Sequence, residues 1–285
     1  MITLREKAYA KLNLTLDVLG KREDGYHDLK SVIQTVDLYD EIEMDLGTGE
    51  PWKLFCGRED IPCDESNLAW KAAALYCNAY GKDPGGITIR IKKNIPSGAG
   101  MAGGSADAAA VLRLLNRYYG ELVSPEELAD LSAKIGSDIP FCVIGGTVMC
   151  EGRGERMRRL KNCPKCIIVG CKPDFSVSTP VLFKEIDSVS IMKHPDNDAM
   201  ESAIINGDID AIAGAVYNVF DPIVARAHTE IGHIKDVCDS CGAMVSQMTG
   251  SGSVVYAIMP DMQCAEKAQK ILETTYSQVF ITEPV

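Results

Sequence analysis

The chain has 285 residues, of which 46% are hydrophobic and 24% are charged, so its composition is that of a globular protein rather than a disordered or fibrous one. At about 100–200 residues per domain, this length favours two domains. The 40 Asp and Glu residues outnumber the 29 Lys and Arg residues, and the net charge of −11 argues against nucleic-acid binders and anionic-membrane binders, which need a basic footprint. A small anionic ligand is compatible with this charge, because it responds to the local field of a cleft.

The ends and the cysteines predict a cytoplasmic protein. Charged residues at Arg5, Glu6, Lys7 and Lys11 interrupt any apolar signal segment, and the longest uncharged run, 240–260, is too polar for a membrane span. Eleven cysteines, an odd number, favour reduced thiols. Two CxxC pairs, 163/166 and 238/241, lie much farther apart than the roughly 15–20 residues that separate the pairs of a zinc ribbon. We therefore expect no metal site and no redox site in them.

The first predicted elements are strands and one helix. Alternating apolar residues at 12–18 predict a half-buried strand whose opposite face is polar: Lys11, Asn13, Thr15 and Asp17. A charged turn at 20–27 leads to another strand at 31–44. A helix is expected at 66–80, with Ser66 as its N-cap and Gly81 as its stop. A strand at 87–92 ends at Pro96.

A glycine-rich loop at 96–105 then runs into a helix that begins at about Gly104. Ser124 and Pro125 predict the start of another helix, which we expect to stop at Gly136. Residues 145–160 hold glycines and a basic cluster, and we place the domain boundary here. The predicted domains are 1–160 and 161–285.

The second half alternates strands and helices. We expect strands at 166–171, 243–248, 253–259 and 278–282, and helices at 179–186, 197–205, 209–219, 223–238 and 262–274. A strand, helices, two strands, a helix and a final strand are typical of an α+β layer with one helical face.

The glycine loop, PSGAGMAGGS, contains a literal GxGxxG, which is a weak signal alone. A Rossmann site would need a buried parallel strand before it and another strand after its helix, and a P-loop would end in Gly-Lys-Ser/Thr; this sequence has neither. Glycines nevertheless let backbone amides approach an anion, and the helix start adds unpaired N–H groups. Ser105 could meet a phosphate oxygen or a magnesium ion. The alternative is a tight strand-to-helix turn that binds nothing.

Three separated segments resemble motifs of the GHMP kinase superfamily of small-molecule kinases: Ala10-Lys11-Leu12-Asn13, PSGAGMAGGSADAAA and MTGSGSVVYA. The resemblance implies an α+β, two-domain GHMP kinase fold, with an N-terminal α/β domain and a C-terminal ferredoxin-like α+β domain. It also implies ATP and Mg²⁺ as cofactors and a ligand cleft between the domains. Two departures are mild: Ala102 replaces a common glycine, and Ala106-Asp107 replaces a Ser-Asn type of pair.

Three further segments are similar to superfamily members that phosphorylate a cytidine diphosphate ester of methylerythritol in the non-mevalonate isoprenoid pathway: KLNLTLDVLGKREDGYHDLKSV, GSDIPFC and PDFSVSTPVLFKEI. This similarity implies transfer of the γ-phosphate of ATP to the 2-hydroxyl of the methylerythritol moiety. Homoserine or mevalonate kinase activity is one alternative, and a non-catalytic nucleotide-binding module is another. We expect small-molecule partners only, and a monomer or weak homodimer.

The resemblance also implies roles for individual residues. Asp138 would take the proton of the acceptor hydroxyl, with Lys11 beside it and Asn13 on the substrate. The nucleotide would contact Asn67 and the loop residues Pro96, Ser97, Gly98, Ala99, Gly100, Met101, Ala102, Gly103, Gly104, Ser105 and Ala106. Cytosine would be recognised by Tyr26, His27 and Phe183, with Thr179 nearby. Gly250, Ser251 and Gly252 would offer amides to the diphosphate.

Each of these roles has a simpler structural alternative. Asp138 could cap a helix that begins near Pro140, and Asn67 could cap the helix that follows it. Lys11 could be a solvated strand residue, and Phe183 could belong to the core. Residues 250–252 could form an ordinary hairpin turn.

Overall fold

The structure is a computed structural model that describes residues 1–285, and the chain divides into two compact units. The first unit contains Met1–Ala10, Leu38–Ser97 and Ala102–Gly145. The second contains Lys11–Asp37, Gly98–Met101 and Gly146–Val285. Strands β1 (Ile2–Asn13) and β3 (His27–Leu46) therefore contribute residues to both units.

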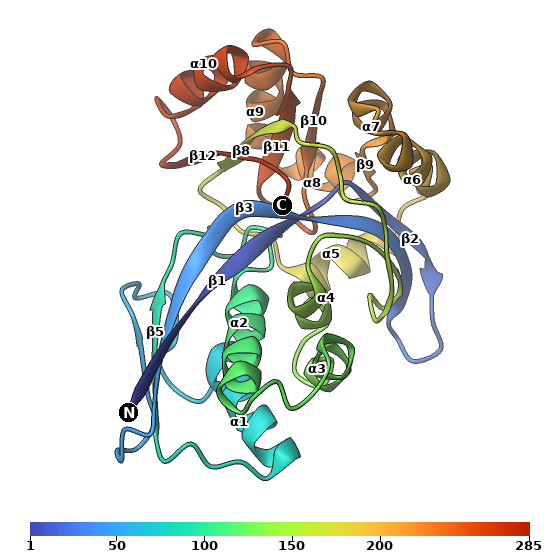
Figure 1. The fold of residues 1–285 in the computed structure, drawn as a ribbon. Coiled ribbons are helices and arrows are strands. Elements are labelled where there is room, and N and C mark those ends of the chain that lie inside the picture. The colour runs from blue at the N-terminus through green and yellow to red at the C-terminus, as the bar shows by residue number, and fades with distance from the viewer. The chain divides into compact units, whose positions relative to one another are not determined.

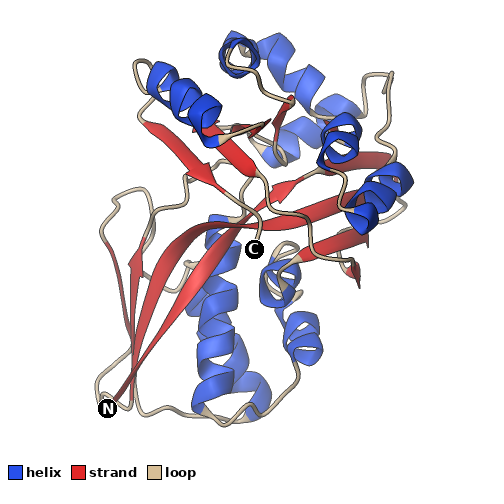
Figure 2. Cartoon of the chain, turned by 45° about the horizontal axis from the view of Figure 1, so that its top comes forward, coloured by secondary structure: helices blue, strands red, loops and turns tan.

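The first unit is a sheet with helices against it (Figure 1). Strand β5 (Ile87–Lys92) pairs antiparallel with residues 41–46 of β3 and parallel with β4 (Lys53–Cys56). Helices α1 (Leu68–Tyr80) and α2 (Gly103–Tyr118) pack on one another, and α3 (Pro125–Ser132) and α4 (Ile139–Ile144) follow (Figure 2). The small and aliphatic residues of α2 are buried, so this helix supplies much of the core of the unit.

In the first unit, helix ends follow the sequence signals closely, with two differences. Asn67, not Ser66, is the N-cap of α1, because its side chain accepts the backbone N–H of Ala69. Gly81 ends α1, as predicted, and its backbone is in the left-handed conformation. Ser124 forms a complete capping box at the start of α3, but that helix ends at Ser132, before Gly136, because the following residues form tighter i→i+3 turns.

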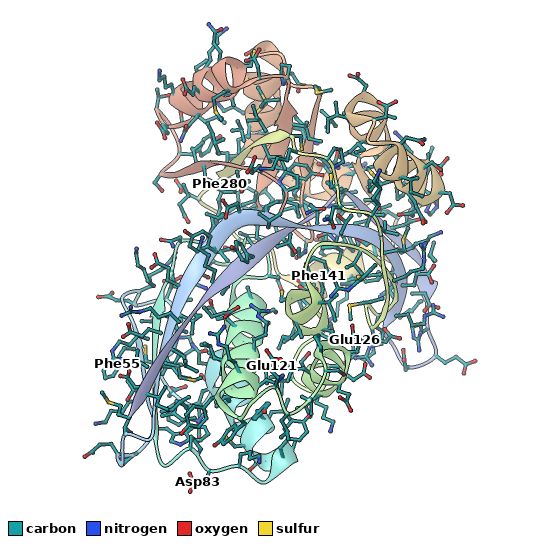
Figure 3. All side chains as sticks on the ribbon, viewed as in Figure 1. Phe55, Asp83, Glu121, Glu126, Phe141 and Phe280 are labelled. Carbon is teal, nitrogen blue, oxygen red and sulfur yellow. The ribbon has the colours of Figure 1, made fainter.

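The second unit contains a four-stranded antiparallel sheet in the order β10 (Val245–Met248), β11 (Val255–Met259), β8 (Ile167–Lys172), β12 (Gln278–Thr282). Helices α9 (Thr229–Ser240) and α10 (Met262–Leu272) pack on it. The chain order β8-α9-β10-β11-α10-β12 is the split βαβ arrangement, which confirms the predicted ferredoxin-like layer. Phe280 (Figure 3) lies across Gly170, where any side chain would overlap its ring.

The remaining strands of the second unit include several that the sequence did not reveal. Strand β2 (Thr15–Lys21) pairs with β3, and β3 pairs with β6 (Thr147–Gly152), which pairs with β7 (Arg156–Arg159). The glycine-rich and basic stretch near residue 150 is therefore a hairpin. A short strand, β9 (Tyr217–Asn218), pairs parallel with β2.

The helices of this unit are α5 (Thr179–Ile186), α6 (Asn197–Asn206), α7 (Ile209–Ala215) and α8 (Asp221–Ala227). The helix predicted at 209–219 ends at Ala215, where β9 follows. The helix predicted at 223–238 is two helices, α8 and α9, separated at His228, whose backbone is extended. No helix in the structure is long and apolar enough to cross a bilayer.

The polar face predicted for residues 11–17 is buried, so the prediction of a half-buried strand was wrong. The strand is also interrupted at Leu14, between β1 and β2. Polar partners replace water on that face: Thr15 Oγ1 donates to Asn197 Oδ1 at 2.6 Å, and His194 Nδ1 lies 2.6 Å from Asp17 Oδ1. These partners lie more than 170 residues away in sequence and could not be read from periodicity.

Candidate active site

The predicted phosphate loop has the backbone conformation of an anion-binding turn. Gly98, Gly100 and Ala102 have positive φ angles of 58°, 74° and 58°. Alternation of left-handed residues with others along a loop turns successive N–H groups toward one side, which is the geometry of an anion-binding nest. Ala102 is the N-cap of α2 but makes no side-chain capping hydrogen bond. The first-turn amides of this 16-residue helix therefore have no side-chain cap and suit a phosphate group.

The second glycine loop, residues 249–253, packs against Gly98–Met101 within the second unit. A side chain at Gly100 would overlap the carbonyl oxygen of Thr249, and a Cβ at Gly250 would lie 2.8 Å from the carbonyl oxygen of Gly100. Val254 N donates to the carbonyl oxygen of Ala99 at 3.3 Å. The glycines at these two positions are therefore required by close backbone contact, and the structure brings together two loops that lie about 150 residues apart in the sequence.

The end of β1 joins these loops. Lys11 N donates to the carbonyl oxygen of Met101 at 3.2 Å, and Asn13 N donates to Thr249 Oγ1 at 2.9 Å. The buried Lys11 ammonium donates to Asn13 Oδ1 at 2.5 Å, and a Cβ at Gly250 would lie 3.2 Å from Lys11 Nζ. All three motifs of the sequence thus meet around one buried ammonium group, and Lys11 is not a solvated strand residue.

Two residues that sequence reasoning missed hold the second loop in place. Asn218 Nδ2 donates to the carbonyl oxygens of Met248 and Gly250, both at 2.8 Å. Asp221 accepts the N–H of Met248 at 2.8 Å and the ammonium of Lys235 at 2.6 Å. The only signal was the run Asn218-Val-Phe-Asp221-Pro, in which a buried amide and a buried carboxylate flank the start of α8.

The segment before α5 lies beside both loops. Thr179 Oγ1 and Ser251 Oγ are 2.8 Å apart, so two residues predicted to contact the substrate share a hydrogen bond. Ser253 Oγ donates to the carbonyl oxygen of Phe175 at 2.7 Å. A Cβ at Gly98 would lie 2.8 Å from Ser176 Oγ, so the phosphate loop touches this segment as well.

His27 and Phe183 form an aromatic stack, with ring centroids 4.8 Å apart and planes inclined by 27°. His27 Nε2 lies 2.7 Å from a carboxylate oxygen of Asp187, whose other oxygen accepts the ammonium of Lys21 at 2.5 Å. The hydrogen bonds from His27 and then Lys21 lower the pKa of Asp187 below its usual value. Asp187 was not predicted, because its partner His27 lies 160 residues earlier in the chain.

Tyr26 is not part of that stack. Its side chain is 53% exposed, and the guanidinium of Arg153 lies 3.7 Å from its ring centroid. Arg153 comes from the turn between β6 and β7, within the basic cluster whose function the sequence left open. The exposed ring and the guanidinium therefore form a separate cation–π pair in the second unit.

Asp138 and Asn67 belong to the first unit. Asp138 stands at the N-cap position of α4, but its exposed carboxylate makes no capping hydrogen bond. The Asp138 side chain therefore does not cap the helix. Asn67 differs: its Oδ1 accepts from Ala69 N and its Nδ2 donates to the carbonyl oxygen of Pro62 at 2.7 Å. Capping is the role that the structure shows for Asn67, and a nucleotide contact stays a prediction.

Comparisons with known proteins match both halves of the chain. Residues 67–146 match the model of the GHMP kinases N terminal domain, and residues 200–278 match that of the GHMP kinases C terminal domain. The 4-diphosphocytidyl-2-C-methyl-D-erythritol kinase of Clostridium beijerinckii is 41% identical over 282 residues, covering 99% of this chain and all of that protein. The chain belongs to the GHMP kinase family.

Solved structures of GHMP kinases share the fold. A crystal structure of 4-(cytidine 5'-diphospho)-2C-methyl-D-erythritol kinase has a TM-score of 0.82 at 28% identity and covers 99% of each chain. Homoserine kinase from Cytophaga hutchinsonii has a TM-score of 0.76 at 15% identity, with 98% of this chain and 94% of that chain covered, and supports the fold alone. The predicted two-domain GHMP kinase fold is thus confirmed.

The two matched ranges of this GHMP kinase divide the predicted site residues. The first range contains Asn67, the phosphate loop and Asp138, and the second contains Gly250 and Ser251. Lys11, Asn13, the Tyr26-His27 pair, Thr179 and Phe183 lie outside both ranges. They do lie within the part of the chain that the Clostridium relative matches, since that similarity covers nearly every residue.

Proposed function

We propose that this chain transfers the γ-phosphate of ATP to the 2-hydroxyl of 4-(cytidine 5'-diphospho)-2-C-methyl-D-erythritol. The observation that supports this specificity best is the stack of His27 on Phe183, with Asp187 fixing the imidazole. A phosphate loop alone would suit any GHMP kinase, whereas an imidazole held in one orientation can read the edge of a base. The full-length relative that bears this activity in its name supports the same choice.

The phosphates of ATP would lie on the amides of residues 98–105. Backbone N–H groups and the start of α2 provide the positive end of a helix dipole there. Residues Pro96, Ser97 and Ala106 flank the loop. A magnesium ion would be held mainly by the nucleotide's own phosphates. The Ser105 hydroxyl, in the first turn of α2, is the side chain of this loop that could add an oxygen ligand, and bound Mg²⁺ would neutralise phosphate charge.

Asp138 would accept the proton of the attacking hydroxyl, and Lys11 would polarise that hydroxyl and the diphosphate. Phosphoryl transfer needs little covalent help from the protein, so positioning and charge neutralisation carry most of the catalysis. The carboxylate of Asp138 is exposed and makes no capping hydrogen bond. The Lys11 ammonium uses one of its three hydrogens on Asn13, which leaves two donors for ligands.

Recognition of cytosine would rest on His27. In the neutral ring, Nε2–H donates to the carboxylate of Asp187, and Nδ1 is then an acceptor. As an acceptor, Nδ1 can receive a hydrogen bond from the amino group of cytosine. Uracil carries a carbonyl oxygen at the same position, which is itself an acceptor and cannot form this bond. The exposed ring of Tyr26 offers a face for stacking, and Phe183 supports the imidazole from one side. Amides of Gly250 and Ser251, with the Thr179 hydroxyl, would contact the diphosphate.

Three further expectations stay predictions. They are a domain boundary near residue 160, a cytoplasmic location and a monomer or weak homodimer. The structural units interleave segments from both halves of the chain, so truncation at residue 160 would not isolate either unit.

A coupled assay of ATP consumption tests the proposed function. The cytidine diphosphate ester, the corresponding uridine ester, homoserine and mevalonate are offered in parallel to the purified protein, and reactions without protein are the control. We expect turnover with the cytidine ester and much less with the uridine ester. Turnover only with homoserine or mevalonate would refute the assignment, and equal use of both nucleotide esters would refute the role of His27.

A further inference from the structure

Three charged side chains meet in the interior of the first unit. Lys93 Nζ donates to Asp107 Oδ2 at 2.7 Å and forms a second short ion pair with Asp40 Oδ2. The side chains of Lys93, Asp40 and Asp107 are only 2%, 0% and 4% exposed. Lys93 directly follows β5, Asp40 lies on β3, and Asp107 lies on α2.

The sequence positions of these residues show what the cluster connects. The 13 residues between Lys93 and Asp107 contain the whole phosphate loop, so this ion pair joins the two ends of the loop. Asp40 secures the first end a second time, because its Oδ1 accepts the backbone N–H groups of Asn94 at 2.5 Å and Ile95 at 2.8 Å. The ammonium also reaches the second end, since a Cβ at Gly103 would lie 3.4 Å from Lys93 Nζ.

The composition of the cluster is poorly explained by stability alone. Above about pH 7, where Asp107 is ionised, two carboxylates and one ammonium leave an excess negative charge in the interior, and Asp107 Oδ1 has no hydrogen-bond partner. A buried ion pair rarely stabilises a protein more than apolar residues of the same volume would, whereas it does fix the geometry of the groups that it joins. An excess negative charge beside a loop that receives phosphates also opposes ligand binding, so a benefit from geometry has to outweigh it.

We propose that Lys93, anchored by Asp40 and Asp107, is a positioning residue that clamps the two ends of the phosphate loop in the conformation that binds ATP. This inference rests on the proposed function. Without the clamp, the loop would have to be ordered when ATP binds, and that ordering cost would weaken ATP binding. Tyr26, His27 and Phe183 belong to the second unit, so we expect recognition of the cytidine ester to be unchanged.

The test uses a double variant, Lys93→Met with Asp107→Asn. Above about pH 7, where Asp107 is ionised, this variant keeps the net charge of the cluster because one positive and one negative charge are removed together. Asp40 retains its two backbone hydrogen bonds in this variant. The matched control is Lys92→Met at the neighbouring lysine, whose side chain is 71% exposed and pairs with Glu41 on the surface. For each protein, the KM values of ATP and of the cytidine ester, the Kd of ATP and the Tm are measured.

For the double variant we expect the KM and Kd of ATP to rise about tenfold, which corresponds to about 1.4 kcal/mol. The KM of the cytidine ester should stay within about twofold, and Lys92→Met should match the wild type in both. Unchanged ATP binding in a folded double variant would refute the clamp, and so would an equal rise of both KM values, which indicates general damage.

A second pair of variants decides the question if the double variant does not fold. Asp107→Leu removes the anchor on α2 and leaves a neutral Lys93–Asp40 pair, so ATP binding should weaken. Asp107→Asn keeps an oxygen that accepts from Lys93, so ATP binding should stay within about twofold of wild type. Equal ATP affinity in these two variants would overturn the proposal. A wild-type protein that binds ATP but does not phosphorylate the cytidine ester would refute the proposed function while leaving the clamp open to the same binding test.

Discussion

Replacement of Asp107 by Asn should stabilise the protein, and the gain should grow with pH. Burial, reinforced by the nearby Asp40 carboxylate and opposed by Lys93, raises the pKa of Asp107 from 3.8 to about 7. The folded protein therefore binds this proton more tightly than the unfolded chain does. It follows that the protein loses stability through Asp107 as the pH rises from about 4 to about 7, and no further loss comes from this group above that range.

The size of the effect follows from the same numbers. A change in pKa of one pH unit corresponds to about 1.4 kcal/mol. The rise of the Asp107 pKa from 3.8 to about 7 therefore lowers the unfolding free energy of the wild type by at most about 4 kcal/mol. The amide introduced by Asp107→Asn would carry no charge at any pH and would still accept a hydrogen bond from Lys93. The difference in unfolding free energy between Asp107→Asn and the wild type should thus increase between pH 4 and pH 7 and become constant above it.

Urea unfolding of both proteins at a series of pH values measures this difference, with equal m-values as the check that both unfold in the same way. Asp45→Asn is a control in which the stability should change in the opposite direction, because hydrogen bonds from Thr3 and Arg90 lower the pKa of Asp45. Its stabilisation is present above about pH 4 and is lost in acid, so Asp45→Asn should be less stable than wild type at neutral pH only. A stability difference for Asp107→Asn that does not vary with pH would refute the reasoning.

Three further variants test the site. Asp138→Asn should lower kcat by about 10²–10⁴ with little change in the KM of ATP, and near-normal steady-state turnover would remove Asp138 from the base role. Asp187→Asn should raise the KM of the cytidine ester several-fold with ATP binding unchanged, because the orientation of His27 is lost; a defect on the ATP side would contradict that assignment. Ala102→Gly should raise the unfolding free energy by about 0.5–1 kcal/mol in urea titrations, because a left-handed backbone strains an alanine and does not strain a glycine. A lower stability would show that the Ala102 methyl group packs usefully.

The elements that the sequence predicted well are those whose signals are local. Helix α5 and strand β12 have the predicted bounds, because a Pro near the start of α5 and an apolar run in β12 suffice to mark them. Both glycine loops were also found from the sequence, since close backbone approach and positive φ angles leave few alternatives to glycine. The sequence motif predicted a role for Lys11, but it did not predict that the residue is buried.

The elements that the sequence missed depend on distant partners. The helical pattern around His228 continues through the break between α8 and α9, but the His228 ring stacks on Phe175 with centroids 3.8 Å apart. Arg156 and its neighbours in β7 were seen only as a basic cluster, because the pairing of β7 with β6 is not visible in composition. Asp187 and Asn218 are polar residues whose roles arise from contacts with His27 and with the loop at Gly250.

The net charge of −11 does not show how charge is distributed near the phosphate loop. In the first unit the ammonium of Lys93 is paired with the carboxyl groups of Asp40 and Asp107, so this cluster carries no net positive charge. The attraction of the loop for phosphate therefore cannot come from that cluster. It has to come from oriented amides and the start of α2, which act only if the loop keeps its conformation. A loop that attracts its ligand by backbone geometry gains more from a fixed conformation than from an additional positive charge, and the proposed clamp gives this role to a lysine that is paired with two carboxylates.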